Sequence, residues 1–275
     1  MVQNFHLPPQ GFGAGSQPED DAALYMEMPQ EMRTYAPHIP EAEGHDAQAG
    51  MALLGQIAEA CQRVADGAAP ESFDLSRLPK ADRALIAEVL GEGEVSVRMR
   101  GIPAVAAQES VFAGVWCLQG AGVDRVDVAP IPPLALERAF NPVRGGQGLS
   151  APKPDGLANA PAILVELLDK SATFGPEAEL HVINLSLLPH TEPDLAWLDA
   201  ALGEGAVTIL SRGYGNCRIS ATATRGIWRV QFFNSMDTLI LDTFEVTAMP
   251  EVAIAAPEDL ADSAGRIRAV MEAIA

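Results

Sequence analysis

The sequence predicts an α+β protein made of two tandem copies of one unit, each a helix plus an antiparallel sheet, with an extended N-terminal arm. Three observations carry this prediction. Sequence landmarks recur in the same order about 112 positions apart, a linker rich in Pro and Gly separates them, and the first 50 residues lack hydrophobic periodicity. We expect an arm at residues 1–50, copies at residues 51–140 and 161–275, and a linker at residues 141–160.

The composition indicates a globular protein with little affinity for nucleic acid or membranes. The chain has 275 residues, 48% hydrophobic content and a formal net charge of −19. Such a chain lacks the basic surface that binds phosphate backbones or anionic lipid, and its acidity serves solubility. Its three cysteines form no Cys-x-x-Cys pair, its first 32 residues hold no Lys or Arg, and no apolar run reaches membrane-spanning length. We therefore expect a cytoplasmic protein.

The arm at residues 1–50 is rich in Pro, Gly and acidic residues, which is typical of extended or partly disordered segments. An island at residues 25–35 contains three Met and two Tyr. Met side chains adapt to irregular apolar surfaces, so the island is suited to docking in an apolar groove. We expect this groove on the protein's own domain, with a partner's groove as the alternative.

The first copy begins with an amphipathic helix. Apolar residues recur at i, i+3, i+7 and i+10, which places them on one helical face. They are Leu54, Ile57, Cys61 and Val64. The helix is expected from about Met51 to just before Gly67, with a counterpart at residues 163–168 of the second copy. Cys61 is therefore expected to pack in the core.

The repeat is defined by short segments that return in order. They are residues 75–79 with 185–189, 90–93 with 202–205, 114–116 with 226–228, and 126–128 with 244–246. The last pair is separated by six extra residues in the second copy, a length change that belongs in a loop. A helix in each copy ends at a Gly-Glu-Gly turn, where Gly91 and Gly203 are suited to the left-handed backbone of a helix C-terminus.

Strands follow each of these turns. Runs rich in β-branched and aromatic residues, bounded by turn residues, indicate four strands in each copy. The expected ranges are 95–99, 105–108, 111–118 and 126–129, then 207–210, 217–223, 227–233 and 238–248. Short Gly, Asn or Pro turns join neighbouring strands, so the sheets are expected to be antiparallel and covered on one face by helices. The closely spaced Pro and Gly of the linker leave no room for a regular element.

No catalytic motif stands out. The chain contains no Gly-x-Ser-x-Gly elbow, no His-Glu-x-x-His and no Walker loop. Its five histidines never fall at metal-ligand spacing, and His181 is expected to be a hydrogen-bonded structural residue at the start of a strand. We therefore expect neither a metal nor a cofactor.

One stretch departs from the acidic average. Residues 205–236 contain no Asp or Glu but four arginines, Arg212, Arg218, Arg225 and Arg229. Its centre, residues 211–218, combines a glycine-rich turn with an aromatic residue and a thiol between two guanidinium groups. We expect a partner-binding site here. Its candidate residues are Arg212, Tyr214, Asn216, Cys217 and Arg218.

A purely structural interpretation of the same stretch is a tight hairpin turn. Strand alternation places Cys217 with Ile219 on one face and Arg218 on the other, so Cys217 is core packing if its face is buried. Trp116 and Trp228, at equivalent positions of the copies, are likewise expected in the core.

Several of these segments resemble the HupH/HyaF family of hydrogenase expression proteins. Residues 181–185, 211–219 and 231–241 are similar to the C-terminal domain of that family, and residues 28–32 and 40–41 to its N-terminal segment. The motif at residues 214–219 is fairly specific to the family.

The resemblance implies a cytoplasmic accessory protein for [NiFe] uptake hydrogenases. It implies the precursor of the iron-sulfur small subunit as a partner, and a thioredoxin-like accessory protein as a further one. The family has no settled catalytic residues, so none is carried over. We expect an assembly factor rather than an enzyme. The alternatives are an enzyme that uses the Cys217 thiol or a persulfide on it, and a small-molecule sensor, which would need an enclosed pocket between the copies.

Overall fold

A computed structural model describes residues 47–175, 178–212 and 216–274. The chain divides into two units, residues 1–38 and 39–275, and all described residues lie in the second. The predicted arm and its island at residues 25–35 lie outside the described residues as far as residue 46. Residues 48–50 of the expected arm belong instead to the first helix.

The first copy contains three helices and five strands in the described residues. They are α1 (Gln48–Ala65), β1 (Glu71–Asp74), α2 (Lys80–Leu90), β2 (Val95–Met99), β3 (Val105–Glu109), β4 (Val115–Gly120), β5 (Val123–Val128) and α3 (Pro133–Arg138). The strand expected at residues 111–118 begins four residues later than predicted, at Val115 of β4. A turn stabilised by the Ser110 side chain, with Gly114 at φ +76°, occupies the residues before Val115.

The second copy repeats this order. It contains α4 (Ala160–Thr173), β6 (His181–Asn184), η3 (Leu185–Leu187), α5 (Glu192–Leu202), β7 (Val207–Ser211), β8 (Asn216–Ala221), β9 (Ile227–Phe233), β10 (Leu239–Val246), η4 (Glu251–Ala253) and a final helix α6 (Pro257–Ile274). The sequence analysis did not anticipate α6. A short 3-10 helix, η2 (Gly148–Ser150), lies in the segment expected to hold no regular element.

All ten strands form one antiparallel sheet in the order β1-β5-β4-β3-β2-β7-β8-β9-β10-β6. Each half of this order has the same connectivity, as the repeat predicts. The halves join where β2 pairs with β7, and Val97 lies opposite Ile209, its own counterpart 112 positions later. The centre of the sheet is therefore a local pseudo-twofold axis.

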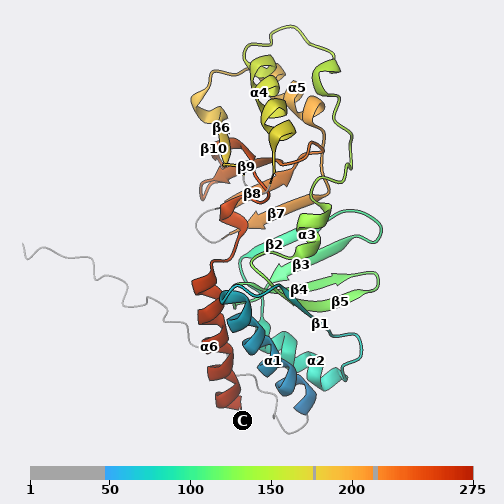
Figure 1. Ribbon diagram of the computed structural model, residues 1–275, viewed down its shortest axis with the longest axis vertical. Helices are drawn as coiled ribbons and strands as arrows, with labels where there is room; N and C mark the ends of the chain where they lie inside the picture. Colours follow the sequence, from blue (N-terminus) through green and yellow to red (C-terminus); the bar gives the residue numbers. More distant parts are fainter. Residues whose placement is uncertain (1–46, 176–177, 213–215, 275) are drawn as a thin grey trace, which may run out of the picture. The chain divides into compact units, whose positions relative to one another are not determined.

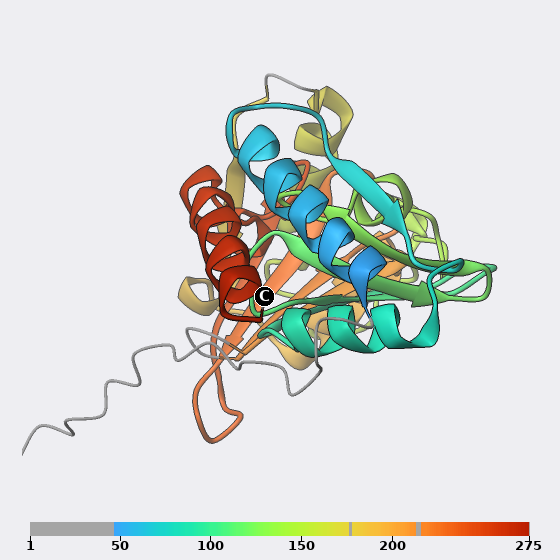
Figure 2. The same ribbon diagram turned by 90° about the horizontal axis from the view of Figure 1, so that it is seen from below.

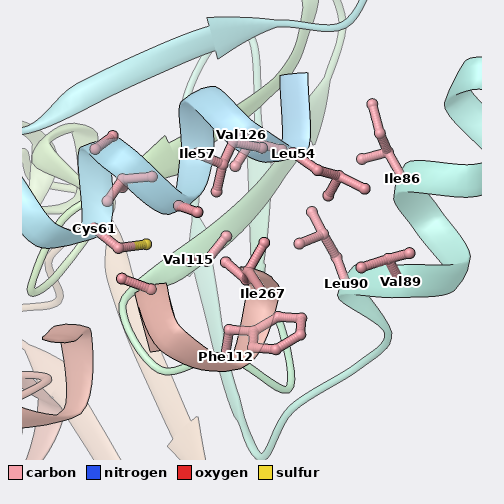
Figure 3. Packing of buried hydrophobic residues seen from close by; sticks show 14 of the residues in the cluster. Leu54, Ile57, Cys61, Ile86, Val89, Leu90, Phe112, Val115, Val126 and Ile267 are labelled. Atoms are coloured by element: carbon pink, nitrogen blue, oxygen red, sulfur yellow. The ribbon is translucent and has the colours of Figure 1, made fainter. Parts of the chain in front are cut away.

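Helices cover the two ends of one sheet face (Figure 1). Helices α1, α2 and α6 pack side by side over the outer strands of the first copy (Figure 2), and α4 and α5 over those of the second. Figure 3 shows the first of these cores, where Leu54, Ile57 and Cys61 of α1 meet Phe112 and Ile267. The expected burial of Cys61 is confirmed.

The opposite face of the sheet carries a core that both copies build. It includes Val97 and Met99 from β2, Ile209 from β7 and the two tryptophans, with α3 and η4 closing over it. The indole of Trp116 donates a hydrogen bond to the carbonyl of Ala129, and that of Trp228 donates one to Thr247. The predicted core role of both tryptophans is confirmed. Residues 51–140 and 161–275 thus share a sheet and a core, while their autonomy as domains stays a prediction.

Repeated local features explain why both halves fold alike. Gly91 and Gly203, which follow α2 and α5, have φ of +55° and +71°, in a region that favours glycine. Their ψ values of −160° and −167° are extended, so they are not the left-handed caps that the sequence analysis expected. Asp82 and Asp194 lie 112 positions apart, and each is buried at the start of its helix. Asp82 accepts a hydrogen bond from the backbone N–H of Gly50, while Asp194 accepts bonds from Ala158 and Ala160.

Candidate functional site

The predicted site residues gather where β7 ends and β8 begins. Arg212 follows the last residue of β7, and Asn216, Cys217 and Arg218 open β8. Tyr214 lies outside the described residues. A hollow of about 380 Å³ is lined by Arg212, Asn216, Cys217 and Arg218. Four of the five candidates therefore line one hollow.

Two further residues of the β9 and β10 hairpin complete this hollow. The guanidinium carbon of Arg218 lies 5.7 Å from the ring centroid of Phe233, within reach of a cation–π contact. The amide of Asn216 donates a 3.1 Å hydrogen bond to Asp237. Phe233 and Asp237 were not predicted as part of the site, because residues brought together by strand pairing lie far apart in the sequence and form no continuous motif. The register that pairs Asn216 with Phe233 brings them together.

The arginine island divides into structural and exposed members. Arg229 bonds to the buried carboxylate of Asp242 at 2.6 Å and to Asp199 at 3.0 Å. Arg225 lies over the ring of Phe174. Arg212 and Arg218 are exposed and make no ion pair with the residues that the structure describes. Arg225 is exposed as well, but of the described arginines of the island Arg212 and Arg218 are those that line the hollow.

Cys217 faces the core, as strand alternation indicates. Its side chain is buried with Ile219 and Val230, while Arg218 points to the other face. Burial raises the pKa of Cys217 to about 11, and the charge of Glu245 adds to the shift. Burial likewise raises the pKa of Cys61 to about 12 and that of Cys117 to about 11. None of the three thiols has the lowered pKa typical of a nucleophile.

A second hollow, of about 590 Å³, lies between the copies on the opposite side of the sheet. Its acidic lining comes from Glu94, Glu109 and Asp259, and Cys217 and Phe232 also border it. Burial raises the pKa of Glu109, and the nearby charges of Asp259 and Glu94 act in the same direction, against a hydrogen bond from the Gly114 N–H.

The described residues offer no metal centre and no membrane-spanning helix. Within them, no group of three or more His, Cys, Asp or Glu side chains is arranged to hold a metal ion. None of the helices in the same residues is long and apolar enough to cross a bilayer. His181 bonds to Glu166 at 2.8 Å, in agreement with its expected structural role.

Comparison with known protein families assigns the chain to one of them. It matches the family described as HupH hydrogenase expression protein, C-terminal conserved region, at residues 47–138 and 157–274. The chain belongs to this family. The matched residues cover both copies and leave out most of the linker, so the family's region corresponds to the duplicated fold.

Full-length relatives agree with this family membership. The chain is 61% identical to the hydrogenase expression/formation protein HupH of Rhodobacter capsulatus, over 100% of both chains. It is 32% identical to the hydrogenase-1 operon protein HyaF of Escherichia coli (strain K12), over 98% of this chain and 96% of that one. A solved structure, the hydrogenase expression protein HupH from Thiobacillus denitrificans, is 29% identical over 42% of this chain and 96% of that chain, with a TM-score of 0.40.

Proposed function

We propose that this protein is a binding and assembly factor in the maturation of a [NiFe] uptake hydrogenase. The observation that carries the proposal is the full-length similarity to proteins named for hydrogenase expression and formation. We further propose that it acts on the precursor of the iron-sulfur small subunit, with a thioredoxin-like protein as an additional partner. In this proposal it works as a chaperone in the cytoplasm and catalyses no reaction.

The candidate site supports binding rather than thiol chemistry. Arg212 and Arg218 are exposed beside a hollow, where guanidinium groups are suited to carboxylates and backbone carbonyls of a polypeptide. Cys217 is buried and its pKa is raised to about 11, so almost none of it is thiolate near neutral pH. These properties favour an assembly factor over an enzyme that uses this thiol.

A small-molecule sensor is the second candidate, and one observation favours it. The hollow of about 590 Å³ between the copies has the size of a ligand pocket, and its charged lining consists of three carboxylates and Arg266. Replacing Glu109 with Gln would remove one of its charges. Under the assembly proposal, Glu109→Gln leaves hydrogenase maturation intact, whereas maturation lost with folding unchanged would favour the sensor.

The test of the proposed function is gene deletion in the native cell with capture of partners. Deletion should lower hydrogenase activity and leave the small subunit incompletely matured, and the tagged wild-type chain should restore both. Mass spectrometry of proteins captured with the tagged chain should find the small-subunit precursor. Normal maturation in the deletion strain, or capture without any hydrogenase subunit, would contradict the proposal.

A further inference from the structure

No helix in the described part of the chain covers the middle of the helix-bearing sheet face. Helices α1, α2 and α6 pack on β4 and β5, while α4 and α5 pack on β9 and β10. Strands β3, β2, β7 and β8 lie between these two groups of helices. On this face Arg98, Ala106 and Arg218 are exposed, and the residues between them are only partly buried. The result is a trough with a floor of four strands and a wall of helices on each side.

The floor of the trough is mostly polar, and half of its side chains are small. Strand alternation and register assign eight residues to it. They are Ser96, Arg98, Ala106, Gln108, Thr208, Leu210, Arg218 and Ser220. Two hollows open on it, one of about 460 Å³ around Ser96 and Arg98 and one of about 380 Å³ around Leu210 and Arg218. Each copy therefore contributes one hollow to the trough, on its own side of the pseudo-twofold axis.

The charge of the trough is opposite to that of the chain. None of the eight floor residues is acidic, although the chain carries a net charge of −19. Among the eight floor residues only Arg98 and Arg218 are charged, and neither forms an ion pair with the residues that the structure describes. The two hollows are also bordered by Arg212, Glu92 and Asp237. An unpaired guanidinium on an exposed floor binds carboxylates well.

The dimensions of the trough fit one helix. Four neighbouring strands span about 14 Å between their outer axes, and an α-helix with its side chains is about 10–12 Å across. Arg98 and Arg218 lie two strands apart and offset by two residues along the strand direction. This register separates the two arginines by about 7 Å along the strands, or four to five residues of helical rise, and by about 10 Å across the strands.

We propose that the trough binds one acidic α-helix of the partner protein, which presents two carboxylates four or five residues apart to Arg98 and Arg218. The proposal rests on the function proposed above, since it names the chemistry that the assembly factor recognises. It extends the site across the pseudo-twofold axis, because Arg98 comes from the first copy and Arg218 from the second. Serine, alanine and threonine on the floor leave room for the helix backbone to approach.

Site-specific photo-crosslinking in the native cell tests this proposal. A photoreactive phenylalanine analogue replaces Ala106, which is exposed in the trough, and a control places it at Leu136, which is exposed on α3 at the opposite face. The crosslinked peptide is then identified by mass spectrometry. We expect the Ala106 position to capture a helical segment of another protein with Asp or Glu four or five residues apart, and the Leu136 position not to capture that segment.

Charge reversal provides the matched control. Arg98→Glu and Arg218→Glu should each lower this crosslink about tenfold. Arg77→Glu makes the same charge change at an exposed residue outside the trough and should leave the crosslink unchanged. Circular dichroism and thermal melting establish that each variant is folded. An Asp or Glu of the captured segment changed to Arg should restore the crosslink with Arg218→Glu.

The outcomes separate this proposal from the proposed function. Capture of residues 1–46 of this chain, of a segment without paired carboxylates, or of nothing at Ala106 overturns the trough proposal. A crosslink that survives both arginine reversals overturns it as well. The identity of the captured protein decides the proposed function independently. A helix of a protein unrelated to hydrogenases would support the trough and contradict the assembly role.

Discussion

Single side chains decide between binding and catalysis in this protein, and Cys217 is the most informative of them. Since burial raises its pKa to about 11, very little of this thiol is thiolate near pH 7. We expect slow alkylation of Cys217 in the native protein and rapid alkylation after unfolding, measured by mass spectrometry of the labelled peptide. The Cys217→Ser variant should still bind its partner. Fast and selective native labelling, together with lost maturation in the serine variant, would favour thiol chemistry.

Strand alternation favoured one of the two interpretations of Cys217, the buried one, but no local pattern indicated the partners of every arginine nearby. Period-two alternation from Cys217 to Ile219 indicated the buried face without any long-range information. Arg229 was counted as part of the basic island because both of its acidic partners, Asp199 and Asp242, lie outside residues 205–236. Its carboxylate, Asp242, lies on the neighbouring strand and meets it only through the register of β9 and β10. For the same reason Arg98, 120 positions before Arg218, could not be assigned to the site from sequence.

At the scale of elements, Asp194 joins two helices of the second copy. Burial raises the pKa of this carboxylate, but backbone N–H donors from Thr191, Ala158 and Ala160 outweigh that effect and lower the pKa to about 2. The Asp194→Ala variant leaves these donors without an acceptor at the starts of α4 and α5. We expect a loss of about 3 kcal/mol in the free energy of unfolding, measured by urea denaturation.

The depressed pKa of Asp194 also predicts a pH dependence. A carboxylate whose pKa falls on folding stabilises the folded state above its ordinary pKa, and this contribution is lost as the pH falls toward about 2. The difference in unfolding free energy between wild type and Asp194→Asn should therefore shrink between about pH 5 and pH 3. Glu192→Gln, at an exposed position of the same helix, serves as the control. A difference that is constant with pH would contradict the capping role.

Helix α6 could have been predicted from the sequence. Its buried residues Leu260, Ala264 and Ile267 fall at i, i+4 and i+7, and Pro257 precedes two acidic residues at its start, so the usual helix indications are present. The pairing of β2 with β7 is different. It depends on two strand edges far apart in the chain, and no local pattern specifies that edges of separate copies join.

At the scale of the whole molecule, the second half of the chain stabilises the first through α6. This helix is carried by the second copy, yet Leu260 lies against Gly114, and Ile267 is buried in the first copy's core. The Ser263 hydroxyl donates to the carbonyl of Ala113. Ile267→Ala should therefore lower the free energy of unfolding by about 2–5 kcal/mol, whereas Glu272→Ala on the exposed side should change it by less than about 0.5 kcal/mol.

Truncation after residue 256 tests the same coupling more severely. Removing α6 uncovers Leu54, Ile57 and Cys61 of α1, so the first copy should lose its protection from amide hydrogen exchange. The second copy keeps α4 and α5 over its own strands, and its residual structure should depend on the shared β2 and β7 ladder. Because that ladder and the core beneath it span both copies, we expect one broadened, less stable transition in urea. An unchanged midpoint in the truncated chain would show that the copies fold independently of α6.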